Sequence, residues 1–261
     1  MNWKYILGSV LMMPLLPVLY YQGKRIRAGI PSLPEASGNE GSVGEGAKLS
    51  LLVIGESTMA GVGVATHEEG FAGNFARELS EELQLGINWR VHARSGYTVR
   101  EVSENIVPHI KDNSPDLIVV GIGANDAFRL NSPRRWVKDV RRLIAVLEDR
   151  FGHSPVVFAN MPPVKEFPAF TPLVRFAIGN LVELLGKELC ELTARYPHVF
   201  YNREILRLAD WAHRVNTTDV SDAFFSDGVH PSRLTYELWA GELAQFILKN
   251  NEIRKRMLDG A

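Results

Sequence analysis

Residues 51–57 read Leu51-Leu52-Val53-Ile54-Gly55-Glu56-Ser57. Four apolar side chains in a row, followed by a glycine and polar residues, are typical of a strand that is buried on both faces and ends in a turn. In open α/β folds, the turns at the carboxyl ends of parallel strands hold the ligand-binding groups. Ser57 is therefore a candidate for chemistry, although a serine in such a place can also be a plain turn residue or a helix N-cap.

Apolar runs alternate with helical patterns after Ser57, which predicts a mostly parallel sheet covered by helices on both faces. The expected strands are residues 50–54, 89–93, 117–121, 156–159 and 199–201. A helix with one buried face is indicated by Phe71, Phe75, Leu79 and Leu83, which recur every four residues. Two more helices are expected, one opening at Ser132 with Pro133 as its first residue and one over residues 232–249.

Two later stretches offer the partners that a nucleophilic serine needs. They are Gly123-Ala124-Asn125-Asp126 and Asp227-Gly228-Val229-His230. The Asn125 amide can donate to a developing oxyanion. Asp227 can reach the imidazole of His230 three residues later and fix its tautomer, while His230 takes the serine proton. Each residue alone has an ordinary structural reading, but together they supply a nucleophile, a base, an orienting carboxylate and an oxyanion donor.

These stretches together resemble the SGNH (GDSL-type) hydrolase family from about residue 49 to residue 250. Ser57 matches the serine of the family's Gly-Asp-Ser-Leu block, and Gly96, within Arg94-Ser95-Gly96-Tyr97-Thr98, matches its glycine block. Asn125 matches the asparagine block and His230 the histidine block. Glu56 and Thr58 depart from the family's usual Asp and Leu, which puts the subfamily in doubt rather than the chemistry.

The resemblance implies a three-layer α/β/α sandwich around a central, parallel, five-stranded sheet of the flavodoxin-like type. It also implies a serine esterase that hydrolyses carboxylic or thio esters through an acyl-enzyme. The catalytic residues would be Ser57, Asp227 and His230, and the oxyanion hole would be formed by Ser57, Gly96 and Asn125.

A second pair with the same spacing, Asp210 and His213, competes for the role of base. Residues 206–213 have helical character throughout, whereas Asp227 to His230 lie in a glycine-containing segment that Pro231 closes. Loops on a rigid scaffold carry catalytic groups more often than helix interiors do. We therefore favour Asp227 and His230.

Several other classes of site are disfavoured. Gly55, Gly61 and Gly63 are not followed by Lys-Ser or Lys-Thr, which argues against a P-loop, and Met59 breaks the Gly-x-Ser-x-Gly elbow of α/β-hydrolases. No histidine pair has metal-ligand spacing and Cys190 is the single cysteine, so we expect no metal and no cofactor. A formal net charge of -1 without a basic stripe argues against nucleic acid as a partner.

The chain of 261 residues, 46% hydrophobic and 23% charged, is expected to form one globular domain. We predict a membrane anchor or signal-like segment over residues 1–22, a flexible linker rich in Pro, Gly and Ser over 23–48, the catalytic domain over 49–250 and a tail over 251–261. The sequence leaves the oligomeric state open.

The N-terminal segment favours membrane association. Residues 5–21 are uncharged and mostly apolar, and about 17 residues is near the lower limit for a membrane span. The run lacks a small-x-small cleavage site, so an uncleaved anchor is favoured over a secreted or periplasmic protein with a removed signal. Lys24, Arg25 and Arg27 follow the run, a weak indication that the domain faces the cytoplasm.

The resemblance implies an ester with a short or lipid-derived acyl group as substrate, for example a lysophospholipid, and an anchor of this kind favours the lipid-derived one. Two alternatives stay open. An acyltransferase would use the same triad and pass the acyl group to an alcohol instead of water. A membrane-tethered binding module would have no use for the triad.

Overall fold

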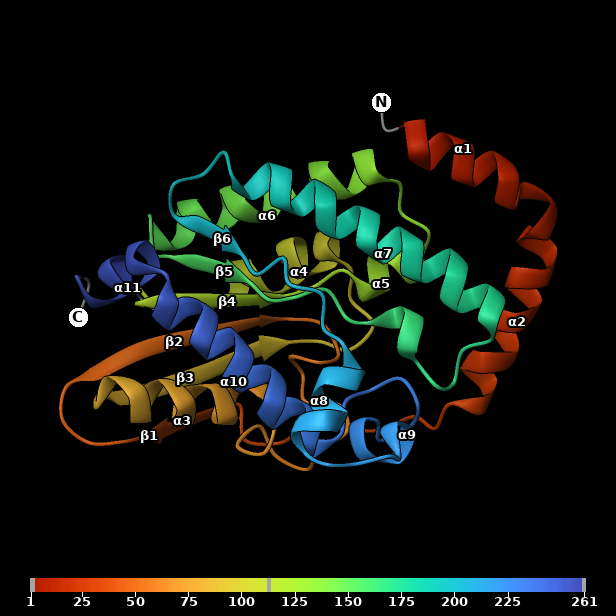
Figure 1. Ribbon diagram of the computed structural model, residues 1–261. Helices are drawn as coiled ribbons and strands as arrows, with labels where there is room; N and C mark the ends of the chain where they lie inside the picture. The colour runs from red at the N-terminus through yellow and green to blue at the C-terminus, as the bar shows by residue number, and fades with distance from the viewer. Residues whose placement is uncertain (1–2, 112–113, 260–261) are drawn as a thin grey trace.

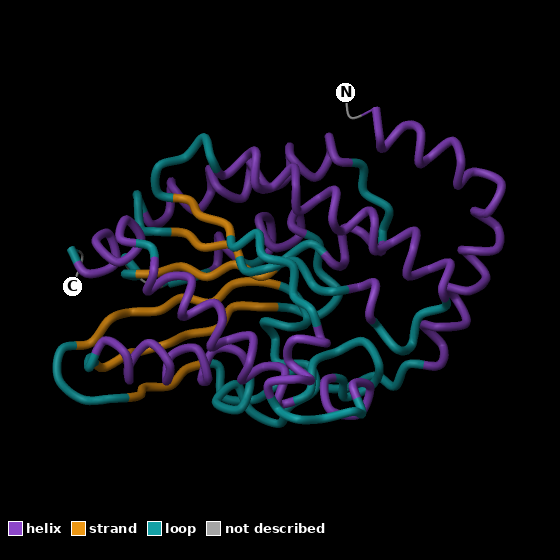
Figure 2. Tube along the Cα trace, viewed as in Figure 1, coloured by secondary structure: helices purple, strands orange, loops and turns teal. Residues whose placement is uncertain are grey.

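The chain alternates between strands and helices, as Figures 1 and 2 show. The computed structural model describes residues 3–111 and 114–259. The strands are β1 Glu40–Val43, β2 Lys48–Gly55, β3 Gly86–Ala93, β4 Leu117–Gly121, β5 Val156–Phe158 and β6 Val199–Tyr201. The α-helices are α1 Trp3–Met12, α2 Leu16–Gly29, α3 Phe71–Leu83, α4 Val99–Asn105, α5 Ala124–Phe128, α6 Pro133–Phe151, α7 Pro172–Thr193, α8 Leu208–Arg214, α9 Val220–Phe224, α10 Arg233–Lys249 and α11 Asn251–Leu258. Short 3-10 turns occupy Met13–Leu15, Val107–His109 and Val164–Glu166.

The expected α/β sandwich is confirmed, with one correction to its sheet. The sheet has six strands in the order β1-β3-β2-β4-β5-β6, rather than five. The five expected strands are all present and pair in parallel, whereas β1 pairs antiparallel with β3 at the edge. The sheet is therefore mixed. Its extra strand comes from a segment that is expected from the sequence to be a linker.

Helices cover both faces of the sheet (Figure 1). Helices α3 and α10 pack together on one face, while α4, α6 and α7 form the layer on the other. The expected helix starts are confirmed: Ser132 caps α6 by accepting the Arg135 amide, and Ser232 caps α10 by accepting the Thr235 amide. This arrangement brings the carboxyl ends of β2, β3 and β4 side by side.

Residues 34–47 are ordered, although the sequence predicts a flexible linker over 23–48. The Ala36 amide donates to the Ala60 carbonyl at 2.9 Å and the Ser37 amide to the Ala65 carbonyl at 3.0 Å. Next, β1 adds to the sheet, with the backbone of Gly41 lying on the indole of Trp89. A glycine is required there because a β-carbon would overlap the ring. We call residues 34–39 the strap, because they bind the domain surface before β1.

The two ends of the chain differ from each other. At the C-terminus, the predicted tail holds helix α11, which buries Ile253 and Met257, so this segment belongs to the domain. At the N-terminus, the helical stretch Tyr5–Gly29 is 25 residues long, has a mean hydropathy of 1.4 and is not buried. It is the one stretch in the described chain that is long and apolar enough to cross a membrane, and a 3-10 turn at Pro14 interrupts its α-helix. Residues 1–2 and 260–261 of the predicted end segments lie outside the described residues.

We predict that a domain beginning at Ala47 is less stable than one beginning at Pro34, since it lacks both the strap and β1. The shorter protein exposes the Trp89 ring and the free edge of β3, and we expect its thermal midpoint to be lower by roughly 5–10 °C. Calorimetry of the two proteins measures the difference. Equal midpoints would show that the strap and β1 add nothing to the stability of the domain.

Candidate active site

Ser57 lies in a tight turn directly after β2. The Ala60 amide donates to the Glu56 carbonyl at 2.8 Å and the Val62 amide to the Ser57 carbonyl at 3.1 Å, so the chain reverses within a few residues. Gly55 makes this possible, because a β-carbon at that position would overlap the Gly121 carbonyl of β4. The Ser57 side chain is half-buried at the carboxyl edge of the sheet.

Gly96 and Asn125 reach the same edge from β3 and β4. Gly96 has a φ of +80°, which favours glycine, and follows β3 by three residues. Asn125 lies in the first turn of α5, and its Nδ2 donates to the Tyr97 carbonyl at 3.1 Å. This bond fixes the Asn125 side chain, which also lies within reach of the buried Glu56 carboxyl group.

Two donors in this region carry no hydrogen bond to the described protein. They are the backbone amides of Ser57 and Gly96. Donors held on a rigid frame without an internal partner are the arrangement that stabilises a developing oxyanion.

A buried carboxyl group, that of Glu56, joins the ends of β2 and β4. Its Oε1 accepts the Ala124 amide at 2.8 Å and its Oε2 accepts the Asn125 amide at 3.0 Å. Burial raises the pKa of Glu56 to about 8, while the amides of Asn125 and Ala124 act in the opposite direction. Glu56 therefore sets the position of Asn125 relative to the serine turn.

Asp126 performs a similar task on the other side of α5. Its Oδ2 accepts the Val99 amide of α4 at 2.8 Å, and its Oδ1 accepts Nδ2 of Asn131 at 2.6 Å. Burial raises the pKa of Asp126 to about 6. The sequence motif contains this residue, but nothing in its spacing indicates that it joins α5 to the turn that precedes α4.

Asp227 and His230 form an oriented pair. The Nδ1 of His230 lies 2.7 Å from Oδ2 of Asp227, and the other oxygen accepts the His230 amide at 2.7 Å and the Val229 amide at 2.9 Å. Burial raises the pKa of Asp227, but the bonds from the His230 ring and the two amides outweigh it and hold the pKa below its usual value. The carboxylate of Asp227 therefore stays ionised near neutral pH.

The loop that carries His230 packs against the serine turn. Gly63 lies on the Pro231 carbonyl, where a β-carbon would overlap it, and the Tyr236 hydroxyl donates to the Val62 carbonyl at 2.8 Å. Within residues 3–111 and 114–259, the Ser57 hydroxyl and the His230 ring make no hydrogen bond to each other. Such bonds are often long in an enzyme without substrate.

The competing pair behaves differently. Asp210 and His213 both lie exposed on α8, and the described chain has no hydrogen bond or ion pair between them. Trp211 between them faces inward, where its indole donates to Glu242 at 2.6 Å. The structure therefore pairs only the Asp227 carboxylate with a histidine at this spacing.

Residues 53–238 match the family model of the GDSL-like lipase/acylhydrolase family. The chain belongs to this family. The expected family and the expected class of ester-bond hydrolase are thus confirmed. None of the curated proteins matches the chain in sequence.

Solved structures of lipases and esterases share the fold. A lipase from a goat rumen metagenome aligns with a TM-score of 0.55 and 19% identity over 76% of this chain and 96% of its own. A mutant of an acetyl-xylooligosaccharide esterase from Geobacillus stearothermophilus aligns with a TM-score of 0.53 and 19% identity over 80% of this chain and 97% of its own. A Bacteroides ovatus protein assigned as a GDSL-like lipase aligns with a TM-score of 0.56 and 17% identity over 80% of this chain, which spans 54% of that larger protein.

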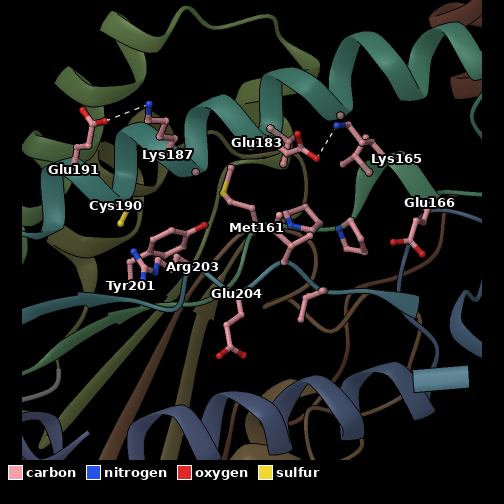
Figure 3. A pocket seen from close by; sticks show the side chains of 18 residues that line it. Met161, Lys165, Glu166, Glu183, Lys187, Cys190, Glu191, Tyr201, Arg203 and Glu204 are labelled. Carbon is pink, nitrogen blue, oxygen red and sulfur yellow. Dashed lines mark ion pairs between the residues drawn. The ribbon is translucent and has the colours of Figure 1, made fainter. Parts of the chain in front are cut away.

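A cavity of about 430 Å³ lies beside the GDSL site, between α7 and residues 201–206 (Figure 3). Met161, Cys190 and Tyr201 are among the residues that line it. Met161 also packs on Gly123, where its methyl group would lie 2.6 Å from a β-carbon. The Met161 side chain thus stands between the cavity and the turn that carries Asn125.

Glu35 of the strap is a residue of this site that the sequence analysis misses. Its Oε1 accepts the Ser95 amide at 2.7 Å, and its Oε2 lies 3.2 Å from Nη1 of Arg94. Glu35 therefore holds the loop that presents the Gly96 amide. Its position in a stretch rich in Pro, Gly and Ser gives no signal of this contact with residues 60 positions away.

We predict that Glu35→Ala lowers kcat for ester hydrolysis about tenfold and changes KM less, because the loop shifts where the oxyanion forms. Steady-state kinetics on a soluble ester measures both constants. Glu35→Gln should restore most of the rate, since its carbonyl oxygen still accepts the Ser95 amide. Arg94→Ala is the matched control that removes the ion pair alone, and an equal loss in this variant would assign the effect to the ion pair.

A second prediction concerns Glu56, whose pKa is 4.5 in its ordinary state and about 8 in the fold. Between these values the folded protein keeps a proton that the unfolded chain has lost, so this residue makes folding less favourable as the pH rises. The thermal midpoint of Glu56→Gln should therefore rise relative to that of the wild type between pH 5 and pH 8. Glu68→Gln on the surface is the control. If the difference in thermal midpoint between Glu56→Gln and the wild type stayed constant over this pH range, the raised pKa of Glu56 would be disproved.

Proposed function

We propose that the protein is a serine esterase that cleaves carboxylic or thio esters through an acyl-enzyme on Ser57. The observation that carries this proposal is the Asp227–His230 pair, held at 2.7 Å on a loop that packs against the serine turn. The backbone amides of Ser57 and Gly96 and Nδ2 of Asn125 would supply the oxyanion hole. The same residues fit each step of acyl transfer.

In the first step, Nε2 of His230 takes the proton of the Ser57 hydroxyl, and Oγ attacks the carbonyl carbon of the ester. The carbonyl oxygen becomes an oxyanion that accepts from the Ser57 and Gly96 amides and from Nδ2 of Asn125. Asp227 remains ionised and stabilises the imidazolium. The tetrahedral intermediate then collapses: the bond to the alcohol oxygen breaks, and the alcohol leaves with the proton from His230.

Water completes the reaction. His230 takes a proton from water, which attacks the acyl carbon, and the bond between that carbon and Oγ of Ser57 breaks as the serine regains its proton. Oxyanion donors of this type typically lower the barrier by roughly 3 kcal/mol each.

The proposed substrate carries a short or lipid-derived acyl group, for example that of a lysophospholipid. The helical stretch Tyr5–Gly29 supports a lipid source, since an uncleaved anchor would keep the site near a membrane surface. Lys24, Arg25 and Arg27, in the last turns of this stretch, favour the cytoplasmic face.

The proposed test measures hydrolysis of p-nitrophenyl esters from acetate to palmitate by the full-length protein in detergent. We expect Ser57→Ala and His230→Gln to lower kcat by on the order of 10³-fold or more while circular dichroism shows an unchanged fold. His213→Gln is the matched control, because this histidine has the same Asp-x-x-His context and should keep the wild-type rate.

The outcomes separate the alternatives. Loss of turnover in His213→Gln but not in His230→Gln would overturn the assignment of the base. Product analysis with an added alcohol distinguishes an acyltransferase, which forms a new ester, from a hydrolase, which forms the free acid. If the folded wild type neither hydrolysed these esters nor transferred the acyl group to the added alcohol, the binding module would be the alternative that fits.

A further inference from the structure

Three metal-ligating side chains meet at the edge of the sheet opposite the candidate active site. Glu148 lies in the last turns of α6, His153 in the turn between α6 and β5, and His198 directly before β6. Since β5 and β6 begin here, the cluster lies at the amino-terminal edge of these strands. The ligand atoms of the three side chains all lie within 4.8 Å of one another.

His198 is the central member of this cluster. The residue is only 2% exposed, and its Nε2 has no hydrogen-bond partner in the described chain. The nearest carboxylate oxygen, Oε1 of Glu148, lies 3.2 Å away but outside the direction of a hydrogen bond. A buried polar atom without a partner is rare, because removing it from water is unfavourable unless another group compensates.

An imidazole binds metal ions through the lone pair of a ring nitrogen, and Nε2 of His198 is a buried nitrogen without a hydrogen-bond partner in the described chain. The nearby cation Arg256 is itself neutralised, since its Nε donates to Glu252 at 2.8 Å. One carboxylate and two imidazoles leave a net negative charge, which favours a divalent cation.

The separation of His198 and Glu148 fits a single ion of the transition-metal type. Tetrahedral Zn²⁺ holds nitrogen and oxygen ligands at about 2.1 Å, so two such ligand atoms are separated by roughly 3.4 Å. The separation of 3.2 Å between Nε2 of His198 and Oε1 of Glu148 is close to this value. The ring of His153 lies beside that of His198, with centroids 4.9 Å apart and an inclination of 57°.

We propose that Glu148, His153 and His198 bind a divalent transition metal ion such as Zn²⁺, with water as the fourth ligand. His153 is exposed and can turn to complete the site, while the buried His198 is already in place. The ion would join the end of α6 to the edge strand β6, whose first contact with β5 is the bond from the Val156 amide to the His198 carbonyl at 2.9 Å. Its role is therefore to stabilise this edge, apart from the ester chemistry.

The sequence analysis expects no metal because no histidine pair has ligand spacing. Glu148 and His153 are five residues apart, and His198 follows only after α7 has crossed the sheet. The fold, rather than a local motif, brings the three side chains together.

The test uses the full-length protein after removal of metals with a chelator. Titration calorimetry with Zn²⁺ should show one ion per chain, and saturating Zn²⁺ should raise the thermal midpoint by on the order of 5 °C. Mg²⁺ should have no such effect, because it prefers an all-oxygen site. His153→Gln and Glu148→Gln, both partly exposed and expected to fold, should weaken Zn²⁺ binding at least tenfold.

His213→Gln removes an exposed histidine elsewhere and should bind Zn²⁺ as the wild type does. Absence of Zn²⁺ binding by the folded wild type would overturn the proposal. So would wild-type affinity in both His153→Gln and Glu148→Gln, because the ion would then be bound by other groups. Neither readout depends on ester hydrolysis, so the proposal stands or falls separately from the proposed function.

Discussion

The candidate site depends on the hydrogen bonds that the buried carboxyl group of Glu56 accepts. Glu56 follows the strand β2 directly, and its carboxyl group accepts the amides of Ala124 and Asn125 at the start of α5, after the neighbouring strand β4. Without such a link, the serine turn and the start of α5 would be joined only by the sheet beneath them. Asp126 and Glu35 extend the same principle, because each uses a carboxyl group to hold backbone amides of a neighbouring loop. The geometry is therefore fixed by polar contacts between loops, above a core that is apolar.

Much of this frame could be predicted from the sequence, for reasons that are local. The continuous apolar run before Gly55 indicates a buried parallel strand, and Ser132 and Ser232 indicate helix starts because a serine accepts an amide of the first turn. The pairing of Asp227 with His230 could also be predicted, since a three-residue spacing in a short loop brings the side chains together. The roles of these residues in catalysis stay predictions.

The rest could not be predicted, because it depends on contacts between distant segments. Strand β1 reads Glu40-Gly41-Ser42-Val43, too short and polar to show a strand pattern, and it forms because the edge of β3 and the Trp89 ring are there to receive it. Glu35 touches the Gly96 loop only in the folded chain. Likewise, nothing local connects His198 with Glu148, whose meeting requires that α6, β5 and β6 are already assembled.

The ordered strap also limits how far the domain can travel from its N-terminal helix. Helix α2 ends at Gly29, and the strap begins at Pro34, so only four residues lie between them. Fully extended, this stretch spans roughly 17 Å, which is less than the thickness of a bilayer. With the helix inserted in a membrane, the site would sample only the lipid leaflet directly beside it and could not reach across to a facing membrane. The length of this four-residue connection, as well as the shape of the pocket, would then decide which esters reach the site.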